Sequence, residues 1–203
     1  MSGPGSALAA IEQAWDAVAE RFPAYELLSP GSASFLCLAS ECPSHCCKIF
    51  SVSLNEREVE RMRRFSALEP VEFLESENGA PIALPLAQPY LLARRDGQCG
   101  LLGEHLLCGQ YEGRPDSCRL YPHFVLFFDP ETLRPVHGDI EGMRASMYAV
   151  LDGAYAPAPY TPVLIRHLDC PGFGGPPLGE EAWRELFVET CRLQYSEAGG
   201  IDW

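Results

Sequence analysis

Cysteines constrain the folding of this chain more than any other residue type. Nine are present among 203 residues, and they are Cys37, Cys42, Cys46, Cys47, Cys99, Cys108, Cys118, Cys170 and Cys191. Their odd number and the adjacent pair fit a disulfide framework poorly. Residues 1–6 carry no Lys or Arg and no apolar segment follows them, which is unlike a secretory signal. We therefore expect a cytoplasmic, reducing setting, where such cysteines typically bind metal or act in catalysis.

The first cluster of cysteines has the spacing Cys37-x4-Cys42-x3-Cys46-Cys47. Thiolates are soft ligands that select zinc, cuprous copper or iron–sulfur clusters, and close spacing lets one loop present several of them to one centre. The side chains of adjacent residues diverge, so Cys46 and Cys47 can serve different metals, or one can bind while the other packs. Burial of all four as small hydrophobic residues is the alternative, which a polar loop disfavours.

The second cluster has the spacing Cys99-x8-Cys108-x9-Cys118, which matches neither a zinc finger nor a ferredoxin. Glycines beside Cys99 and Cys108 allow backbone N–H groups to approach the sulfurs. Arg114 and Arg119 can offset the charge of several thiolates or hold an anionic substrate group. For Arg114 an ordinary surface ion pair is an equal alternative.

The remaining cysteines differ in their surroundings. Cys170 precedes Pro-Gly in a glycine-rich loop, a context typical of a ligand, whereas Cys191 lies on the apolar stripe of a helix and is expected to be structural. His45, His105 and His123 border the clusters and are held as reserve ligands. A Cys118 nucleophile is formally possible, but it would leave the other cysteines unexplained.

Periodicity and turn residues predict an α+β fold, a loop-rich single domain with helices around short strands, organised by cysteine-ligated metal or iron–sulfur centres, with the two clusters converging in space. The predicted elements are helices over residues 6–22, 53–65, 141–151 and 179–196, a hairpin joining 90–93 to 99–102, a strand over 124–128, loops over 69–89 and 170–177, and a linker over 152–162. Ser53 is the expected N-cap of the second helix, with Glu56 completing a capping box, and the charges along this helix are expected to be solvated. The division expected is 1–34 as N-terminal helix and lead-in, 35–175 as the cysteine-cluster domain, and 176–203 as a C-terminal helix packed on it.

Net charge limits the partners of the chain. The formal charge is −13, which disfavours binding to phosphate backbones and favours a protein partner or substrate with a basic surface. No apolar run approaches the roughly 18 residues that span a bilayer, so neither nucleic acid nor membrane is expected as a partner.

The sequence resembles the YkgJ-type cysteine-cluster family, described as zinc- or iron-chelating and including the flagellin lysine N-methylases. The resemblance rests on Cys108-x-x-Tyr111-x-x-Arg114-Pro115-x-x-Cys118-Arg119-x-x-Pro122 and on Cys170-Pro171-Gly172, and it covers about residues 35–175. Spacing in the first cluster is wider than in the family pattern. The resemblance implies metal binding by the eight cysteines other than Cys191, and a cofactor-binding role for Tyr111, Arg114 and Arg119.

Three functions follow as hypotheses. An iron–sulfur protein, with a 4Fe-4S cluster favoured, is the first; the methylase relatives suggest a redox or protein-modifying enzyme, although no S-adenosylmethionine site is recognisable. A zinc-stabilised interaction module without catalysis is the second, since closed tetrahedral sites leave no open position. Metal trafficking is the third. Whether the chain is an enzyme stays open at this point.

Overall fold

The computed structural model describes residues 4–38, 41–42, 45–152 and 158–195. The chain forms two compact units, neither of which is continuous in sequence. Unit 1 comprises Met1–Phe35, Pro122–Asp169 and Phe173–Trp203, and unit 2 comprises Leu36–Tyr121 and Cys170–Gly172. Residues 122–169 lay inside the predicted cysteine-cluster domain, 35–175. In the structure they belong to unit 1, together with the N-terminal and C-terminal segments of the chain.

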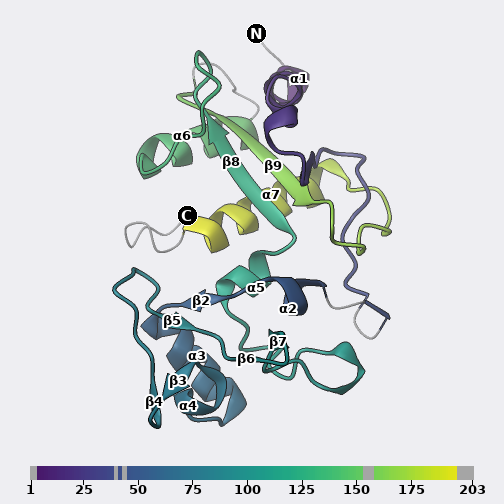
Figure 1. Cartoon of the computed structure of the whole chain (residues 1–203). Helices are drawn as coiled ribbons and strands as arrows, with labels where there is room; N and C mark the ends of the chain where they lie inside the picture. Colours follow the sequence, from purple (N-terminus) through teal and green to yellow (C-terminus); the bar gives the residue numbers. More distant parts are fainter. Residues whose placement is uncertain (1–3, 39–40, 43–44, 153–157, 196–203) are drawn as a thin grey trace. The chain divides into compact units, whose positions relative to one another are not determined.

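Unit 1 is built on a three-stranded antiparallel sheet (Figure 1). The strand order is β1 (Tyr25–Leu27), β9 (Thr161–His167) and β8 (His123–Phe128). Residues 161–165 of β9 are buried one after another, so both faces of this central strand are covered. The covering helices are α1 (Pro4–Asp16), α6 (Ile140–Leu151) and α7 (Glu180–Tyr195).

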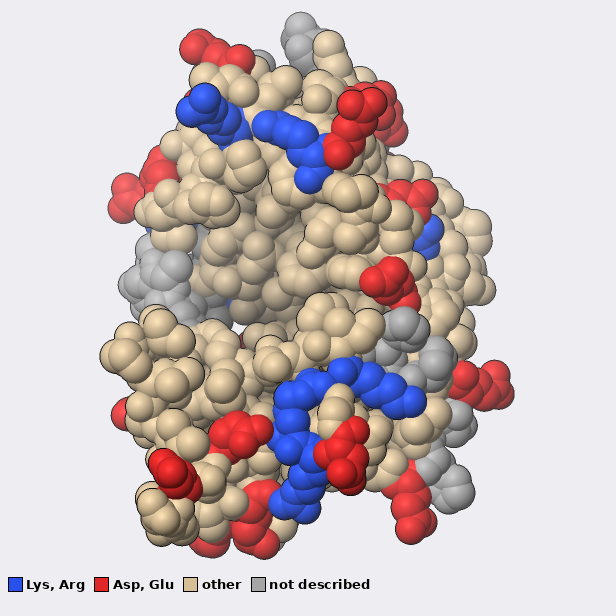
Figure 2. Space-filling model, in the orientation of Figure 1, with Lys and Arg blue, Asp and Glu red and all other residues tan. Residues whose placement is uncertain are grey.

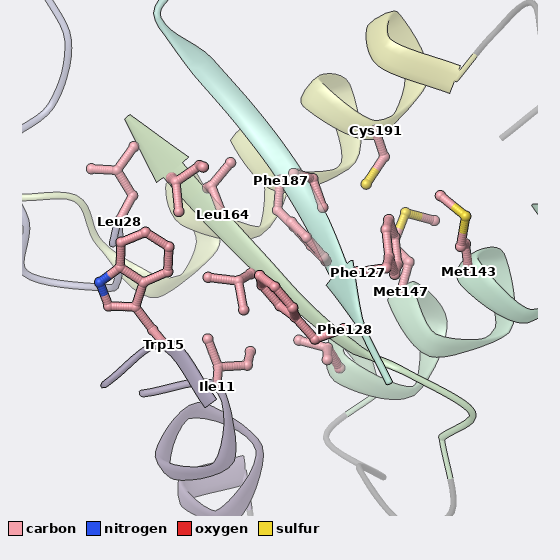
Figure 3. Close-up of a cluster of buried hydrophobic side chains, with 14 of the residues drawn as sticks. Ile11, Trp15, Leu28, Phe127, Phe128, Met143, Met147, Leu164, Phe187 and Cys191 are labelled. Atoms are coloured by element: carbon pink, nitrogen blue, oxygen red, sulfur yellow. The ribbon is translucent and has the colours of Figure 1, made fainter. Parts of the chain in front are cut away.

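Large apolar side chains from these helices and strands form one core (Figure 3). Trp15 of α1 and Phe187 of α7 pack with Phe127 and Leu164 of the sheet. Trp183 donates a hydrogen bond from Nε1 to the carbonyl of Leu28 at 2.8 Å, which satisfies its buried polar atom. Cys191 is fully buried in this core, as the sequence predicted for a structural cysteine.

Most of the predicted elements of unit 1 are confirmed. The strand over 124–128 begins one residue earlier, and the helices over 141–151 and 179–196 correspond to α6 and α7. The helix over 6–22 was too long, because α1 ends at Asp16 and a short 3-10 helix, η1 (Ala19–Arg21), follows a turn.

The predicted linker over 152–162 was wrong at its end, where β9 begins at Thr161. Its residues 153–157 lie outside the described part of the chain. The apolar run Val163-Leu164-Ile165 lacks the alternation of a half-exposed strand, because β9 is buried on both faces.

Unit 2 consists of short elements. Its helices are α2 (His45–Ile49), α3 (Glu56–Ser66), α4 (Pro70–Phe73) and α5 (Asp116–Leu120), with the 3-10 helix η3 (Glu104–Leu106). Three two-stranded ladders pair β2 (Ser53–Leu54) with β5 (Tyr90–Leu91), β3 (Ser76–Glu77) with β4 (Ala80–Pro81), and β6 (Arg94–Arg95) with β7 (Gln98–Cys99). Among the described residues its buried apolar core has only five members, Leu54, Met62, Phe73, Leu74 and Leu92, against sixteen in unit 1.

Two local predictions in unit 2 change. The N-cap of α3 is Asn55 rather than Ser53, and the capping box is completed by Glu58 rather than Glu56. Ser53 cannot cap the helix because it pairs with Leu91 in the β2–β5 ladder. Residues 90–91 pair with β2 in that same ladder and not with residues 99–102. The observed hairpin is therefore shorter than predicted and joins Arg94–Arg95 to Gln98–Cys99.

The turn predicted for this hairpin is confirmed. Asp96 and Gly97 have φ angles of 51° and 78°, the left-handed conformations that a two-residue turn between antiparallel strands requires.

No helix within the described ranges combines the length and the apolar character needed to cross a membrane.

His123 gives unit 1 a pH-dependent stability. Its ring lies between Phe35 and Phe173, with centroid distances of 5.6 Å to each, and burial lowers its pKa to about 4. An unfolded histidine titrates near pH 6.5, so between these values the unfolded chain binds a proton that the folded chain excludes. Stability is therefore full above pH 6.5 and falls as the pH drops towards 4.

We expect unit 1 to lose about 2 kcal/mol of stability between pH 7 and pH 4.5 through this histidine. His123→Gln should remove that part of the pH dependence, whereas His137→Gln, at an exposed position, should leave it. Urea unfolding followed by tryptophan fluorescence measures it, since Trp15 and Trp183 lie in the core of unit 1. Equal pH slopes in wild type and His123→Gln would show that this ring is not the cause.

Candidate metal centre

All eight cysteines predicted as ligands belong to unit 2, and Cys191 alone belongs to unit 1. The nine are free thiols. Most of unit 2 is the continuous stretch Leu36–Tyr121, but Cys170 joins it from far along the sequence in a three-residue segment, Cys170–Gly172. Thiols from distant parts of the chain therefore share one compact unit.

Helix α2 carries the adjacent cysteines of the first cluster. Cys46 Sγ and Cys47 Sγ are 3.9 Å apart and share a hydrogen bond. This hydrogen bond lowers the pKa of Cys46 to about 6, whereas the same bond, together with burial, raises the pKa of Cys47. One thiol of the pair therefore gives up its proton more readily than the other.

The second cluster lies beside this helix. α2 packs against β7, the strand that ends at Cys99, and Cys108 forms an isolated antiparallel bridge with Leu102. Burial, and to a smaller extent the charges of Cys99, Cys108 and Cys46, raise the pKa of Cys118 to about 12. The two clusters therefore lie within electrostatic reach of each other, as the sequence predicted.

Cys170 associates with the outer cysteines of the first cluster. The Leu36 N–H donates to the carbonyl of Gly172 at 2.7 Å, which brings the segment leading to Cys37 beside the Cys170 loop. Burial raises the pKa of Cys170, and Cys42, Cys46 and Cys37 raise it further. Cys46 therefore interacts electrostatically with Cys108 and Cys118 as well as with Cys170.

A buried charge network holds the turn that leads to Cys118. Glu58 of α3, which is 2% exposed, accepts a hydrogen bond from the Asp116 N–H at 2.7 Å. Arg61 donates to the carbonyl of Arg114 at 2.9 Å and pairs with the Asp116 carboxylate at 2.8 Å. The expectation that the charges of this helix are solvated is therefore wrong for Glu58, because its carboxylate both caps α3 and anchors α5.

Gly113 brings the same turn close to α3. A Cβ atom at this position would lie 2.9 Å from Cβ of Phe65, so only glycine lets the loop approach the helix this closely. The network and this contact together fix the segment that carries Arg114 and Cys118 onto a regular helix.

Arg114 and Tyr111 form a stacked pair in this loop. The Arg114 guanidinium lies 3.7 Å from the centroid of the Tyr111 ring, and its Nε donates to the Tyr111 carbonyl at 3.0 Å. Its positive charge opposes the rise that burial causes in the pKa of Cys108 and Cys118. Arg119 instead pairs with Asp116 at 3.7 Å.

Figure 2 shows basic side chains grouped over unit 2, with carboxylates among them.

Of the three reserve histidines, His123 is the one whose side chain the structure describes. His123 lies in unit 1, and the side chains of His45 and His105 lie outside what the structure describes. Across the described ranges, no three His, Cys, Asp or Glu side chains are arranged closely enough to hold a metal ion. The donor chemistry nevertheless suits a soft metal, since eight thiols share unit 2 and the charge of Arg114 acts on two of them.

Residues 36–141, just over half of the chain, match the model of the family described as "CxxCxxCC: Putative zinc- or iron-chelating domain". The chain belongs to this family, as the motif around Cys108 and Cys118 predicted. No significant match was found among curated proteins or among solved structures. The matched range includes seven of the eight cysteines and excludes Cys170, which the fold brings to the others.

The anchor at Glu58 yields a stability prediction for unit 2. Glu58→Ala leaves the buried N–H of Asp116 without its acceptor and removes the cap of α3, and we expect a loss of about 1–3 kcal/mol in the metal-free, reduced protein. Urea unfolding followed by far-ultraviolet circular dichroism measures the loss, while tryptophan fluorescence should not change.

Glu60→Ala is the matched control, because Glu60 pairs with Arg63 at the surface of the same helix. An equal loss in both variants would mean that any acidic residue lost from α3 weakens unit 2, and the anchoring role of Glu58 would be refuted.

Proposed function

We propose that unit 2 binds an iron–sulfur cluster through cysteine thiolates, a 4Fe-4S centre being favoured. The observation that carries this proposal is the gathering of eight thiols from distant segments in one unit. Cys46, Cys99, Cys108 and Cys118 are the proposed ligands of the cluster, because α2 packs against β7 and the charges of the first three raise the pKa of Cys118. Cys47 neighbours this set, and Cys37, Cys42 and Cys170 are proposed to hold a second metal or to act as a redox pair.

The small core of unit 2 supports a metal as a structural component. Its strands are two residues long and its described apolar core has five members, which is little for a unit of this size. Small domains of this kind commonly gain their folding free energy from metal–ligand bonds. A metal ion or cluster would join the segments that apolar packing holds only weakly.

Iron–sulfur is preferred to zinc on two grounds. The irregular spacing of the eight thiols departs from that of zinc modules. Arg114, stacked on Tyr111, carries a positive charge that acts on Cys108 and Cys118, which suits the net negative charge of a thiolate-bound cluster.

The proposal extends to a redox or protein-modifying activity in the cytoplasm. The cluster, when bound, would supply electron transfer. Arg114, Tyr111 and Arg119 would bind an anionic group of a substrate or cofactor beside it, since Arg114 is oriented by stacking and by its hydrogen bond to the Tyr111 carbonyl. The net charge of −13 favours a protein substrate or partner with a basic, lysine-rich surface.

Metal and acid-labile sulfide content, with a visible spectrum, test the proposal on protein purified without oxygen. We expect iron with sulfide in wild type and in Cys191→Ser, because Cys191 lies in the core of unit 1. Cys46→Ser, Cys108→Ser and Cys118→Ser should each lose the metal and destabilise unit 2 together.

Stoichiometric zinc without sulfide would overturn the iron–sulfur proposal in favour of a zinc-stabilised interaction module. Labile, substoichiometric metal would overturn it in favour of metal trafficking. Loss of metal in Cys191→Ser would show that the ligand assignment is wrong.

Arg114 yields a second prediction. Reduction adds negative charge to the cluster, and a nearby guanidinium stabilises that charge, so Arg114→Gln should lower the reduction potential. A potentiometric titration measures it against Arg64→Gln, which removes an exposed arginine of α3. Identical potentials in the two variants would place Arg114 outside the electrostatic environment of the cluster.

A further inference from the structure

Helix α2 is too short to be stable on its own. It spans five residues, His45–Ile49, far fewer than the dozen or so that an isolated helix needs in water. Its last carbonyls lack partners within the helix, as at any helix C-terminus. The positions of Cys46 and Cys47 therefore depend on contacts that other segments make with α2.

The side chain of Arg94, on the β6–β7 hairpin, supplies such a contact. Its guanidinium donates to the carbonyls of Lys48 and Phe50, each at 2.6 Å. The same guanidinium donates to the carbonyl of Gly97 in the hairpin turn. One half-buried side chain thus joins the end of α2 to the hairpin whose second strand ends at Cys99.

We propose that Arg94 is a positioning residue that sets the Cys46–Cys47 pair against Cys99. The inference rests on the proposed function, since it assigns Arg94 a role in assembling the thiols that would bind the metal. Arg94 touches no thiol itself in any contact described here. It acts through backbone carbonyls, so it fixes where α2 lies relative to β7 and leaves the sulfurs free to bind.

The chemistry of arginine suits this role. A guanidinium is planar, always charged and offers five N–H donors in a fixed fork, so it can bind three carbonyls at once. Carbonyls at a helix C-terminus carry partial negative charge and attract a cation. A lysine ammonium is a single point and can satisfy only some of these acceptors.

The neighbouring arginine provides a matched comparison. Arg95 is exposed and donates to the carbonyl of Glu72 at 3.3 Å, away from α2. Both residues belong to β6, so substitution of either removes one positive charge from the same hairpin. Of these two arginines, Arg94 is the one whose printed hydrogen bonds reach the segment of α2.

A second contact keeps the test informative. Phe50, directly after α2, packs on Tyr121 with ring centroids 5.1 Å apart, and Tyr121 follows the helix that carries Cys118. Loss of Arg94 should therefore loosen α2 without releasing it entirely. The expected defect is one of thiol placement rather than unfolding of unit 2.

The experiment uses the full-length, reduced, metal-free protein, with Cd²⁺ as the probe for affinity and Co²⁺ as the probe for thiolate coordination. Arg94→Met should weaken Cd²⁺ binding about tenfold or more, the range seen when residues that orient metal ligands are removed. It should also weaken the thiolate-to-Co²⁺ charge-transfer absorption. Arg94→Lys should fall between, and Arg95→Met should match wild type.

Crosslinking measures the same placement without any metal. A short thiol-reactive crosslinker should join the peptide of Cys46 and Cys47 to that of Cys99 in wild type and Arg95→Met, with that product lost in Arg94→Met. Trypsin releases peptides 22–48 and 96–119, and fragmentation of the joined pair then assigns the crosslink to Cys46 or Cys47 and to Cys99 rather than to the other cysteines of these peptides.

The outcomes separate the two proposals. Unchanged affinity, spectrum and crosslinking in Arg94→Met would refute the role of Arg94 while leaving thiol metal binding intact. Failure of wild type to bind Cd²⁺ or Co²⁺ would instead refute metal binding by these thiols, and the crosslink alone would then decide whether Arg94 places α2. Equal defects in Arg94→Met and Arg95→Met would mean that lost hairpin charge is responsible, which also refutes the inference.

Discussion

The scarcity of apolar packing in unit 2 governs how that unit can be stable. Five buried side chains form its described core, and its ladders are two residues long, so hydrophobic burial cannot be the main source of cohesion. Polar anchors fill part of the gap, with Glu58 and Arg61 holding one segment and Arg94 another. Each anchor lies next to a segment that carries cysteines.

Unit 1 solves the same problem by ordinary burial. Its central strand is covered on both faces and its edge strand β8 is closed by a side chain, because Gln194 both accepts from and donates to the backbone of Val125 at 2.8 Å. The two units therefore respond differently to their surroundings. Unit 1 depends on apolar area and on the protonation of His123, whereas unit 2, under the function we propose, depends on metal binding by its thiols.

The sequence predicted the parts of the structure that depend on local pattern. Amphipathic periodicity predicted α6 and α7, Asp-Gly predicted the hairpin turn, and the spacing around Cys108 and Cys118 predicted the family. It could not predict that Ser53 joins a ladder or that Glu58 is buried, because both depend on partners far away in sequence. Arg94 was missed for the same reason, since its acceptors lie more than forty residues earlier.

Because the three-residue segment Cys170–Gly172 belongs to unit 2, the two units cannot easily be separated by recombination or by protein engineering. Neither unit is a continuous segment, so neither can be excised, duplicated or transplanted by a single cut at each end. A fragment limited to residues 36–141 would lack Cys170 and would carry β8 without β9. A recombination event that transfers all eight cysteines of unit 2 in one segment must therefore also transfer residues 122–169 of unit 1.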